Sequence, residues 1–429
     1  MSSLKIAIAG LGTVGAGVVK LLQDNSSGIE ARAGRRIEVV AVSARNKNKD
    51  RGIDVFSFAW HDDPKELISS DADVILELMG GEGGPAEALV SEALKRGKAV
   101  VTANKALLAH HGSELAKLSF ENKAPLLFEA AIAGGIPIVK MLREGLSANQ
   151  IDKLYGILNG TCNYILTTME ATGRDFSDVL KEAQAKGYAE AEPSLDVDGW
   201  DAAHKLSLLT ALAFGVEPDL NAMTVRGIRE ITAQDIQTAD ELGYRIKLIG
   251  QAYRCDDGSV VQVVEPCLVV KKASLANVHG VLNAVYTYGN HVGPTFIEGR
   301  GAGAGPTASA VVADLIDLAR GNAIPAFGVA TSDLKPLKPR DPQEESGEYY
   351  IRLVVLDQPG VIADVAAILR DYHISIESLI QRGRDPGQPV TVALTTHEVQ
   401  RRFLNGAVSM IGGLKSITEP PLILQRLSL

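Results

Sequence analysis

Short apolar runs alternate with amphipathic stretches along the first third of the chain. Each run is brief, rich in valine, isoleucine and leucine, and bounded by turn residues, as buried strands are. The runs cover residues 4–9, 37–43, 73–78, 99–102 and 125–130, and helical patterns lie between them at 85–96 and 107–122. Strands that alternate with helices predict a parallel, doubly wound sheet. We therefore expect residues 1–140 to form one α/β domain.

The pattern changes near residue 140. Helical periodicity and strand-like runs now occur without regular alternation, which predicts an α+β domain over residues 141–305. The expected helices are 161–171, 175–186 and 199–214, and the expected strands are 151–158, 247–253 and 259–270. The glycine-rich stretch 299–309 leads into a helical pattern at 306–320, which could return to the first domain and complete it.

A third unit follows a proline-rich segment. Residues 331–347 hold prolines among charged residues, a composition typical of a linker. Beyond it, residues 348–429 show a strand, a turn at 358–361, a helix and a further strand. We expect a separate small domain there.

Composition limits the class of protein. The chain has 429 residues, of which 46% are hydrophobic, enough for two or three domains with proper cores. Its net charge of −9 argues against a nucleic-acid or anionic-membrane partner. No apolar run approaches the roughly 18 residues of a membrane-spanning helix, and a strand begins too early for a signal peptide. The three cysteines fit a reducing, cytoplasmic location, and the absence of HExxH and CxxC patterns argues against a zinc site.

The first strand runs directly into a glycine-rich turn that opens a helical pattern. In this context Gly10 permits the tight turn, Gly12 lets the backbone approach a pyrophosphate, and Gly15 allows close packing of helix on strand. Free N–H groups at the helix start, at Thr13 and Val14, then meet the anion. The first domain is therefore expected to be a Rossmann-type dinucleotide-binding domain.

The end of the second strand bears on which dinucleotide binds. An NAD enzyme usually places an acidic residue there to hold the ribose hydroxyls, whereas this chain continues from Ser43 with Ala-Arg-Asn-Lys-Asn-Lys. Arg45 could bind a 2′-phosphate through two hydrogen bonds. We therefore favour NADP(H) over NAD(H). The alternative is that Arg45, Lys47 and Lys49 only face solvent.

A carboxylate-rich loop near the middle of the chain predicts a polar pocket. Asp201 and Lys205 are four residues apart on an expected helix, so they share one face. The acidic residues that precede them are Glu190, Glu192, Asp196 and Asp198. Carboxylates could hold a substrate ammonium group, and a protonated lysine could donate to a carbonyl oxygen whose carbon receives hydride. The alternative is an ordinary ion pair on a helix surface.

Two further segments could complete this pocket. Lys105 follows an expected strand that ends at Thr102, at the carboxyl edge where doubly wound sheets bind ligands. Gly160 and Thr161 open an expected helix, whose free N–H groups suit a carboxylate. Cys162 lies beside them, but no partner histidine is evident, so we expect a packed thiol rather than a nucleophile.

Several motifs, taken in order, resemble homoserine dehydrogenase over essentially the whole chain. They are GLGTVG, TANKALLA, FEAAIAGGIPIV, GILNGTCNYILT, GYAEAEPSLDVDGWDAAHK and GRGAGAGPTAS. One departure is Glu192, where the family usually has Asp; the charge is kept, and no loss of function is expected. The resemblance implies NAD(P)H-dependent interconversion of L-aspartate 4-semialdehyde and L-homoserine, in the biosynthesis of threonine, methionine and isoleucine. It also places catalysis and dimerisation in residues 141–305.

The resemblance assigns roles by position, with Lys205 as the acid/base residue. The expected catalytic residues are Lys105, Asp201 and Lys205. The expected substrate-binding residues are Gly160, Thr161, Gly187, Tyr188, Glu190 and Asp201. The expected cofactor-binding residues, with those argued above, are Gly10, Gly12, Thr13, Val14, Gly15, Arg45, Thr102, Lys105 and Gly303. Residues 129–136 match the family's sodium-binding loop, where mostly backbone carbonyls hold the ion. The expected ligands of sodium, or of another monovalent cation, are Glu129, Ile132, Gly134 and Ile136; a glycine turn without an ion is the alternative.

Residues 348–429 resemble an ACT domain, a βαββαβ module that often senses an amino acid. Residues 357–361 match its first strand-to-helix turn. The resemblance suggests feedback control, with threonine the usual effector, and a purely structural role in assembly is the alternative. It also implies a homodimer or homotetramer.

Two other functions can be weighed against this one. A semialdehyde dehydrogenase that makes an acyl-phosphate would need an activated thiol with a histidine base. A non-catalytic sensor that joins a dinucleotide site to an amino-acid site would not need Lys105 and Lys205. No kinase domain is fused to the chain, so we expect a monofunctional enzyme.

Overall fold

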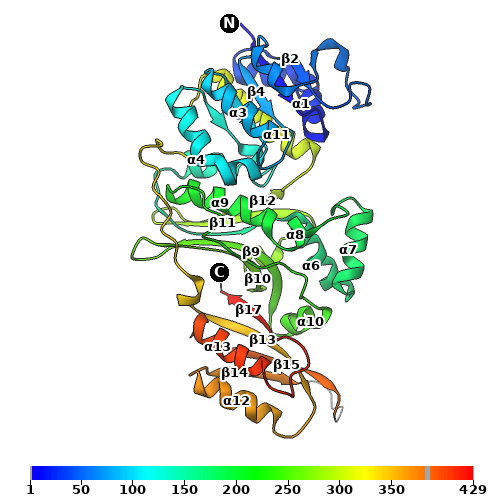
Figure 1. Cartoon of the computed structure of the whole chain (residues 1–429), viewed down its shortest axis with the longest axis vertical. Coiled ribbons are helices and arrows are strands. Elements are labelled where there is room, and N and C mark those ends of the chain that lie inside the picture. Colours follow the sequence, from blue (N-terminus) through cyan, green and yellow to red (C-terminus); the bar gives the residue numbers. More distant parts are fainter. Residues whose placement is uncertain (1, 382–386, 429) are drawn as a thin grey trace.

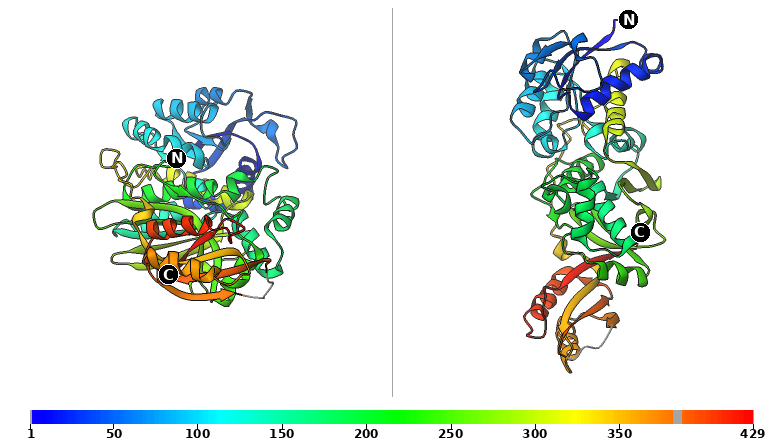
Figure 2. Two further views of the ribbon diagram at one scale, coloured as in Figure 1. Left: turned by 60° about the horizontal axis from the view of Figure 1, so that its bottom comes forward. Right: turned by 90° about the vertical axis from the view of Figure 1, so that its right-hand side faces the viewer.

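The computed structural model describes residues 2–381 and 387–428 of the chain. Three units follow one another along the long axis of an elongated molecule (Figure 1, Figure 2). The N-terminal unit lies at one end, the C-terminal unit lies at the other, and the middle unit separates them (Figure 1). No helix of the described part is long and apolar enough to cross a bilayer.

The N-terminal domain is built on a parallel sheet with the strand order β3-β2-β1-β4-β5-β6. The strands are β1 (Leu4–Ala9), β2 (Ile37–Ser43), β3 (Ala59–His61), β4 (Val74–Glu77), β5 (Ala99–Thr102) and β6 (Leu126–Leu127). The order reverses between β1 and β4, and at such a point the carboxyl ends of the strands leave a crevice for ligands. The predicted doubly wound fold is confirmed.

Helices cover both faces of this sheet. On one face lie α1 (Thr13–Asp24) and α11 (Ala304–Arg320), and on the other lie α3 (Pro85–Lys95) and α4 (Lys105–Glu121). Alternate residues of β1 supply the two cores, since Ile6 and Ile8 pack with α1 and α11 while Ala7 packs on the opposite side. Although α11 is far from α1 in sequence, the two helices lie together, so the chain returns to its first domain.

The middle domain is a mainly antiparallel sheet in the order β12-β11-β7-β9-β10. Its strands are β7 (Ile151–Ile157), β8 (Thr224–Val225), β9 (Tyr244–Arg254), β10 (Val260–Val270), β11 (Leu282–Gly289) and β12 (Gly293–Arg300). Its helices are α6 (Gly160–Thr172), α7 (Phe176–Ala185), α8 (Ser194–Val197), α9 (Trp200–Phe214) and α10 (Ala233–Glu241). The helices and strands predicted here are present. The hairpin β11–β12 was not predicted, because its glycines and Pro294 weaken the strand pattern.

The expected domain boundary at residue 140 falls inside a helical segment. The helix α5 (Ile138–Lys140) continues into the π-helical η4 (Met141–Gly145). Side chains on both sides of that position are buried. No flexible connection therefore lies there.

The C-terminal unit has the βαββαβ order of an ACT domain. Its elements are β13 (Ser346–Leu356), α12 (Val361–Asp371), β14 (Ile376–Gln381), β15 (Pro389–Thr396), β16 (Val399–Gln400), α13 (Arg401–Gly412) and β17 (Leu422–Leu427). The strand order is β17-β13-β15-β14, and α12 and α13 share one core with the sheet. The expected ACT fold is confirmed.

The C-terminal unit has its own core, but its sheet is continuous with that of the middle domain. β17 pairs with β13 and also, in parallel, with β10, so the two domains share one 11-stranded sheet. On β13, Arg352 forms a buried ion pair with Asp235 of α10, and Tyr350 donates a hydrogen bond to the same carboxylate at 3.1 Å. The expected linker 331–347 is also packed, with Leu334 and Leu337 buried in the core of the middle domain. Long-range pairing of this kind leaves no mark in local sequence patterns.

Candidate active site

A cavity of about 680 Å³ lies between the N-terminal and middle domains. Its walls come from the first turn of α1, from the loops after β4 and β5, from the segment 130–134, and from the starts of α6, α9 and α11. The predicted site residues that line it are Val14, Lys105, Gly134, Gly160, Thr161, Gly187, Tyr188, Asp201, Lys205 and Gly303. The fold thus brings together residues that lie far apart in the sequence.

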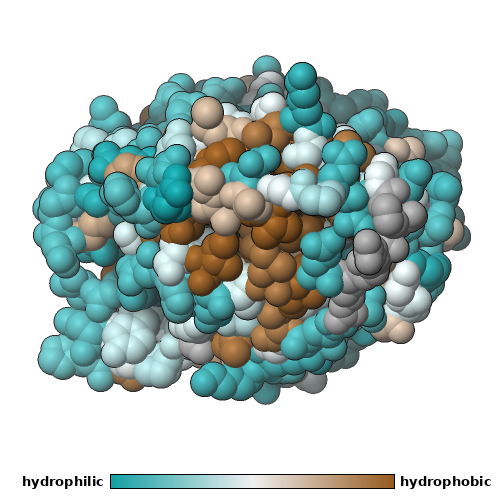
Figure 3. All heavy atoms as spheres, turned by 90° about the horizontal axis from the view of Figure 1, so that it is seen from below, coloured by the Kyte–Doolittle hydropathy of each residue, from teal (hydrophilic) through white to brown (hydrophobic). Residues whose placement is uncertain are grey.

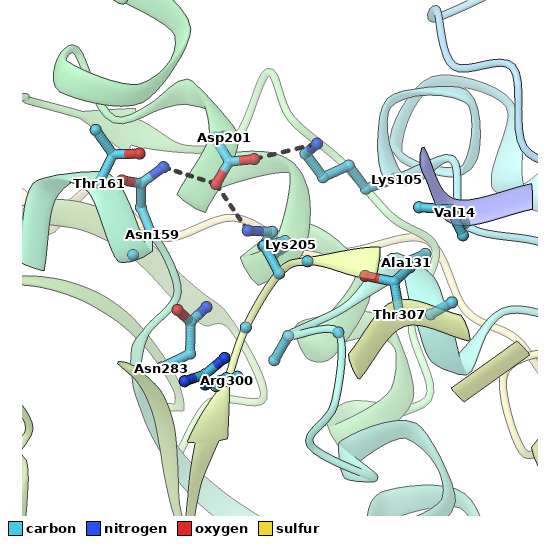
Figure 4. A pocket seen from close by; sticks show the side chains of 18 of the residues that line it. Val14, Lys105, Ala131, Asn159, Thr161, Asp201, Lys205, Asn283, Arg300 and Thr307 are labelled. Atoms are coloured by element: carbon cyan, nitrogen blue, oxygen red, sulfur yellow. Dashed lines mark hydrogen bonds and ion pairs between the residues drawn. The ribbon is translucent and has the colours of Figure 1, made fainter. Parts of the chain in front are cut away.

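Asp201 lies at the centre of the polar wall. One carboxylate oxygen is 3.1 Å from the ammonium of Lys105, and the other accepts hydrogen bonds from Lys205 at 2.7 Å and Asn159 at 2.8 Å (Figure 4). Burial, with only 6% of the residue exposed, would by itself raise the pKa of Asp201, but the charges of Lys205 and Lys105 hold the pKa below its usual value. Asp201 is therefore an anion that two cations share.

Lys205 is held by two acceptors. Its ammonium donates to the carbonyl oxygen of Leu158 and to Asp201, each at 2.7 Å. Asp201 and Lys205 share one face of α9, as the four-residue spacing predicted, but the pair is buried rather than on a helix surface. An ammonium has three N–H donors, so one remains for a ligand in the cavity.

Lys105 reaches the site from the other domain. It is the first residue of α4, whose N-terminus is capped by Asn104, which accepts from the N–H of Leu107 at 3.1 Å. From there its side chain crosses to Asp201 on α9. The ion pair therefore joins the dinucleotide-binding domain to the middle domain at the cavity.

Asn159 organises the start of α6. Its side-chain oxygen accepts from the N–H of Cys162 at 2.7 Å, and its amide nitrogen donates to Asp196 at 2.7 Å and to Asp201. Burial and the charge of Asp201 raise the pKa of Asp196. Because Asn159 takes the N–H of Cys162, the N–H groups of Gly160 and Thr161 are the ones left for a carboxylate.

The glycine turn has the geometry that a pyrophosphate requires. Gly10 has a φ of +99°, and a Cβ there would lie 2.5 Å from the carbonyl oxygen of Leu78. At Gly15 a Cβ would lie 2.3 Å from the carbonyl oxygen of Gly10, while nothing lies within 4 Å of a Cβ at Gly12. No side chain caps the N-terminus of α1. Gly12 and the first N–H groups of the helix are therefore open to an anion.

Thr102 lies behind the cavity rather than on its wall. Its hydroxyl donates to Glu77 at 2.6 Å and accepts from the N–H of Asn104 at 2.9 Å. Glu77 in turn accepts from the N–H groups of Met79 and Gly80, at 2.9 and 3.2 Å, and so shapes the loop after β4. Thr102 supports the cofactor side of the site, and its direct contact with a cofactor stays a prediction.

Arg45 and Glu190 are exposed and do not line the cavity. Arg45 lies in the loop after β2 and makes no recorded ion pair or hydrogen bond with the described residues. Glu190 follows Tyr188, whose carbonyl oxygen accepts from the hydroxyl of Thr161 at 2.6 Å. The roles of Arg45 and Glu190 also stay predictions.

The segment 129–136 contributes backbone rather than side chains. The carboxylate of Glu129 accepts from the N–H groups of Val139 and Lys140, at 2.9 and 2.8 Å, and burial raises its pKa. Ile132 and Ile136 have hydrocarbon side chains, so the only oxygen atoms that these residues can offer a cation are carbonyl oxygens. Gly134 has a φ of +48°, which turns the chain sharply. Carbonyl oxygens suit a hard cation.

Cys162 is packed, as predicted. Its thiol is fully buried and lies 3.2 Å from the carbonyl oxygen of Asp196. Burial raises the pKa of the thiol well above its usual value, and the thiol is then a poor nucleophile. An acyl-enzyme route through this cysteine has no support.

Some lining residues were given no role from the sequence. They are Asn159, Asn283 and Arg300. Asn159 carried a usable signal, since an asparagine directly before an expected helix is a common N-cap. Asn283 and Arg300 lie on the hairpin that the sequence pattern missed.

Three family models match the chain. Residues 10–129 match the homoserine dehydrogenase NAD-binding domain, residues 137–316 match homoserine dehydrogenase, and residues 349–402 match the ACT domain. The homoserine dehydrogenase of Neisseria gonorrhoeae is 43% identical over 429 residues, with 98% of each chain covered. That of Pseudomonas aeruginosa is 43% identical over 436 residues, again with 98% of each covered.

Solved structures agree with these relatives. A homoserine dehydrogenase from Thiobacillus denitrificans has a TM-score of 0.93 and 40% identity, covering 100% of this chain and 99% of that one. A hyperthermophilic archaeal homoserine dehydrogenase in complex with NADPH has a TM-score of 0.62 and 27% identity, covering 74% of this chain and 97% of that one.

Proposed function

Since the chain belongs to the homoserine dehydrogenase family, and so interconverts L-aspartate 4-semialdehyde and L-homoserine with a nicotinamide dinucleotide, we propose that Lys205 is the acid/base residue of that reaction and that Asp201 holds it in place. The observation that carries this proposal is the bridge from Asp201 to two lysines, one from each domain, beside the open glycine turn.

The proposed chemistry follows from the donors in the cavity. The dinucleotide, when bound at the glycine turn, supplies the hydride for reduction and accepts it in oxidation. Two N–H groups of Lys205 are held by Leu158 and Asp201, and the third meets the aldehyde oxygen of the substrate. As the carbonyl carbon is reduced, Lys205 gives this oxygen a proton. In the oxidation, the neutral amine takes the hydroxyl proton of homoserine.

We propose that the start of α6 and the loop before α8 bind the amino-acid end of the substrate. The N–H groups of Gly160 and Thr161 suit the α-carboxylate. The hydroxyl of Thr161 holds the carbonyl of Tyr188, which fixes the loop that leads to Glu190. Glu190 then neutralises the α-ammonium group. Lys105 orients substrate and cofactor, because it comes from the cofactor's domain and pairs with the catalytic aspartate.

For the cofactor we propose NADP(H) in preference to NAD(H). The loop after β2 offers the unpaired cation Arg45 and lacks the acidic residue that would hold the ribose hydroxyls. Initial rates of L-homoserine oxidation with NADP+ and with NAD+ test both the reaction and this preference. A higher kcat/KM with NADP+ is expected, and no turnover from folded protein with either cofactor would reject the function.

We propose sodium, or another monovalent cation, at the carbonyls of Glu129, Ile132, Gly134 and Ile136. The support is a sharply turned loop in which backbone N–H groups occupy the Glu129 carboxylate and the other three residues have no side-chain oxygen, which leaves carbonyl oxygens as ligands. The thermal midpoint should rise on titration with sodium chloride but not with tetramethylammonium chloride. Equal shifts with both salts would reject a specific site.

For the ACT domain we propose amino-acid sensing, with threonine as the effector. The supporting contacts run from this domain to the active site. Arg352 donates to Thr232, at 3.2 Å, and pairs with Asp235 at the start of α10. Just before it, Ile228 donates its N–H to Val197 of α8 at 2.8 Å. Asp196, which binds Asn159, is the neighbour of Val197 on that helix. A ligand that shifts β13 could therefore reach the catalytic residues.

Threonine should be tested on the full chain, because the shared sheet makes removal of the ACT domain disruptive. Lower activity or a shifted thermal midpoint with L-threonine, but not with D-threonine, is expected. No response in either measurement would leave assembly as the role of the ACT domain.

We propose a homodimer or homotetramer in the cytoplasm. The strands β12 and β14 are open edges of the large sheet, and Tyr288 and Phe296 near one of them are exposed. Apolar side chains also gather on the face seen from the ACT end (Figure 3). Patches of this kind often mark interfaces. The cysteines Cys162, Cys255 and Cys267 are free thiols, which suits a reducing compartment. Light scattering should give a mass of two or four chains, and a monomer would reject the oligomer.

A further inference from the structure

We infer that Arg51 is a positioning residue for cofactor selection: it ties the loop after β2 to the glycine turn and so fixes where Arg45 can meet a 2′-phosphate. The inference rests on the proposed preference for NADP(H), and it adds a residue that touches neither the substrate nor the phosphate.

All three hydrogen bonds that the guanidinium of Arg51 donates to the described residues go to backbone carbonyls. Nε donates to Leu11 at 2.7 Å, Nη1 donates to Lys49 at 2.7 Å, and Nη2 donates to Asn46 at 2.6 Å. A planar guanidinium presents its donors in a fixed fork. One rigid group therefore binds two carbonyls of the loop and one carbonyl of the glycine turn. Asn46 adds a local turn, because its side chain accepts from the N–H of Asn48 at 2.9 Å.

Through its Nε, the Arg51 guanidinium is bound to the glycine turn. Leu11 stands between the glycines that form the pyrophosphate turn, and its side chain is 2% exposed in the core under α1. Its carbonyl oxygen is therefore a fixed point. Through Arg51, the positions of residues 46–49 are set relative to the place where the pyrophosphate would lie.

Aromatic rings lie close to two cations of the loop. The guanidinium carbon of Arg51 is 5.8 Å from the centre of the Trp60 ring. The ammonium of Lys47 is 5.4 Å from the ring centre of Phe56 and 5.8 Å from that of Trp60. Arg51 and Lys47 thus each interact with other groups of the protein. Arg45 is exposed and makes no hydrogen bond or ion pair with the described residues, so it can turn toward a phosphate.

The two possible roles of Arg51, positioning the loop or binding the phosphate, predict different effects of substitution on cofactor affinity. A lysine at position 51 keeps the charge, but one ammonium cannot reproduce a flat fork that serves three carbonyls. If Arg51 acts through the loop, Arg51→Lys should be nearly as harmful as Arg51→Met. If Arg51 contacts the phosphate, Arg51→Lys should retain most of the affinity.

The test compares Arg51→Lys, Arg51→Met, Arg45→Ala and the double variant Arg45→Ala/Arg51→Lys, with Arg96→Lys as control. Arg96 belongs to the same domain and pairs with Glu92 on the outside of α3. The dissociation constants of NADP+ and NAD+ are measured by titration calorimetry. Hydrogen exchange of the amides at 44–50 is measured without cofactor, and kcat is measured at saturating cofactor.

For each Arg51 variant we expect NADP+ to bind roughly tenfold more weakly, as the loss of one charged hydrogen bond implies, with a smaller change for NAD+. The loop amides should exchange faster, and kcat should stay at the wild-type value. The double variant should bind NADP+ no more weakly than Arg45→Ala does, because Arg51 acts through Arg45.

Three results would overturn the inference: rescue by Arg51→Lys, additive losses in the double variant, or equal weakening of both cofactors, which a merely structural role would give. If Arg45→Ala leaves the ratio of the two affinities unchanged, the proposed cofactor preference itself fails. If only the Arg51 variants leave that ratio unchanged, the preference stands and the positioning role fails.

Discussion

The cavity around Asp201 and the loop around Arg45 both gather cations, but they hold them in opposite ways. In the cavity, Lys105 and Lys205 share one buried carboxylate, and each charge has a partner within the protein. In the loop, Arg45 keeps its charge in solvent, and Arg51 holds the backbone around it. A buried charge that loses its partner is costly, whereas an exposed charge contributes little to stability. We therefore assign rate and stability to the first region, and cofactor choice to the second.

The largest effect should follow the loss of Lys205, the proposed acid/base residue. Lys205→Ala should lower kcat by roughly a thousandfold, within the range for general acid–base catalysis, while the dissociation constant of NADPH stays unchanged. Steady-state rates and fluorescence titration measure the two quantities. Lys117→Ala, which removes an exposed lysine of α4 paired with Glu121, should behave as wild type. A kcat within threefold of wild type in Lys205→Ala would remove this residue from the mechanism.

Breaking the shared carboxylate should harm stability as well as rate. Asp201→Asn leaves two ammonium groups facing each other, and removal of one partner from a buried pair costs about 3–5 kcal/mol. Urea denaturation at pH 7 should show this loss in the free energy of unfolding. Asp240→Asn breaks an exposed pair with Lys271 and should cost at most about 1 kcal/mol. Equal losses in the two variants would mean that burial of the cluster is unimportant.

Lys247 differs from Lys105 and Lys205, because it is a buried lysine that shares no carboxylate with another cation. Its ammonium donates to the carbonyl oxygen of Val278 at 2.6 Å and to Asn163 at 3.1 Å, and burial lowers its pKa to about 8. Above this pKa the folded state has lost a proton that the unfolded chain keeps up to its usual pKa of 10.5. The folded state binds fewer protons in that window, so this group makes stability rise with pH from about 8 to about 10.5.

The measurement is urea denaturation of the wild type and Lys247→Met at several pH values. The difference in free energy of unfolding should shift in favour of the wild type by up to about 3 kcal/mol between pH 8 and pH 10.5. Below pH 8 the difference should be constant. A difference that does not change with pH would show that the pKa of Lys247 is not lowered.

The smallest effect belongs to the exposed loop. Arg45→Ala should raise the KM for NADP+ by about tenfold, one charged hydrogen bond, and should change the KM for NAD+ much less. The free energy of unfolding should stay within about 0.5 kcal/mol of wild type, as for other surface substitutions. Initial-rate kinetics with both cofactors measure the two KM values. Equal changes in the two KM values would show that Arg45 does not contact the 2′-phosphate.

Local patterns predicted the parts of the site that lie close together in sequence. The glycine turn could be identified because its strand and helix flank it, and Asp201 and Lys205 could be paired by their spacing on one helix. The same reasoning could not show that this pair is buried. That depends on the packing of α9 between the sheet and the first domain, which is a long-range property.

Contacts between distant segments were not predictable from local patterns. The place of Lys105 at the carboxyl edge of the sheet suggested that it belongs to the pocket, but its contact with Asp201 could not be predicted, because no periodicity links two helices in different domains. The pairing of β17 with β10 and the fork of Arg51 on Leu11 left no local signal either. An arginine in a polar loop is typical of a solvated surface, and only the fold places three carbonyls around it.

If the buried cluster sets the rate and the exposed loop sets cofactor choice, substitutions in the two regions should act independently of each other. The double variant Asp201→Asn/Arg45→Ala tests it most directly, through kcat and the KM for NADP+ measured beside both single variants. We expect the double variant to have the kcat of Asp201→Asn and the KM of Arg45→Ala, with free energies that add to within about 0.5 kcal/mol, as for distant sites. A coupling energy above about 1 kcal/mol, the range for sites in contact, would contradict the division between the two regions.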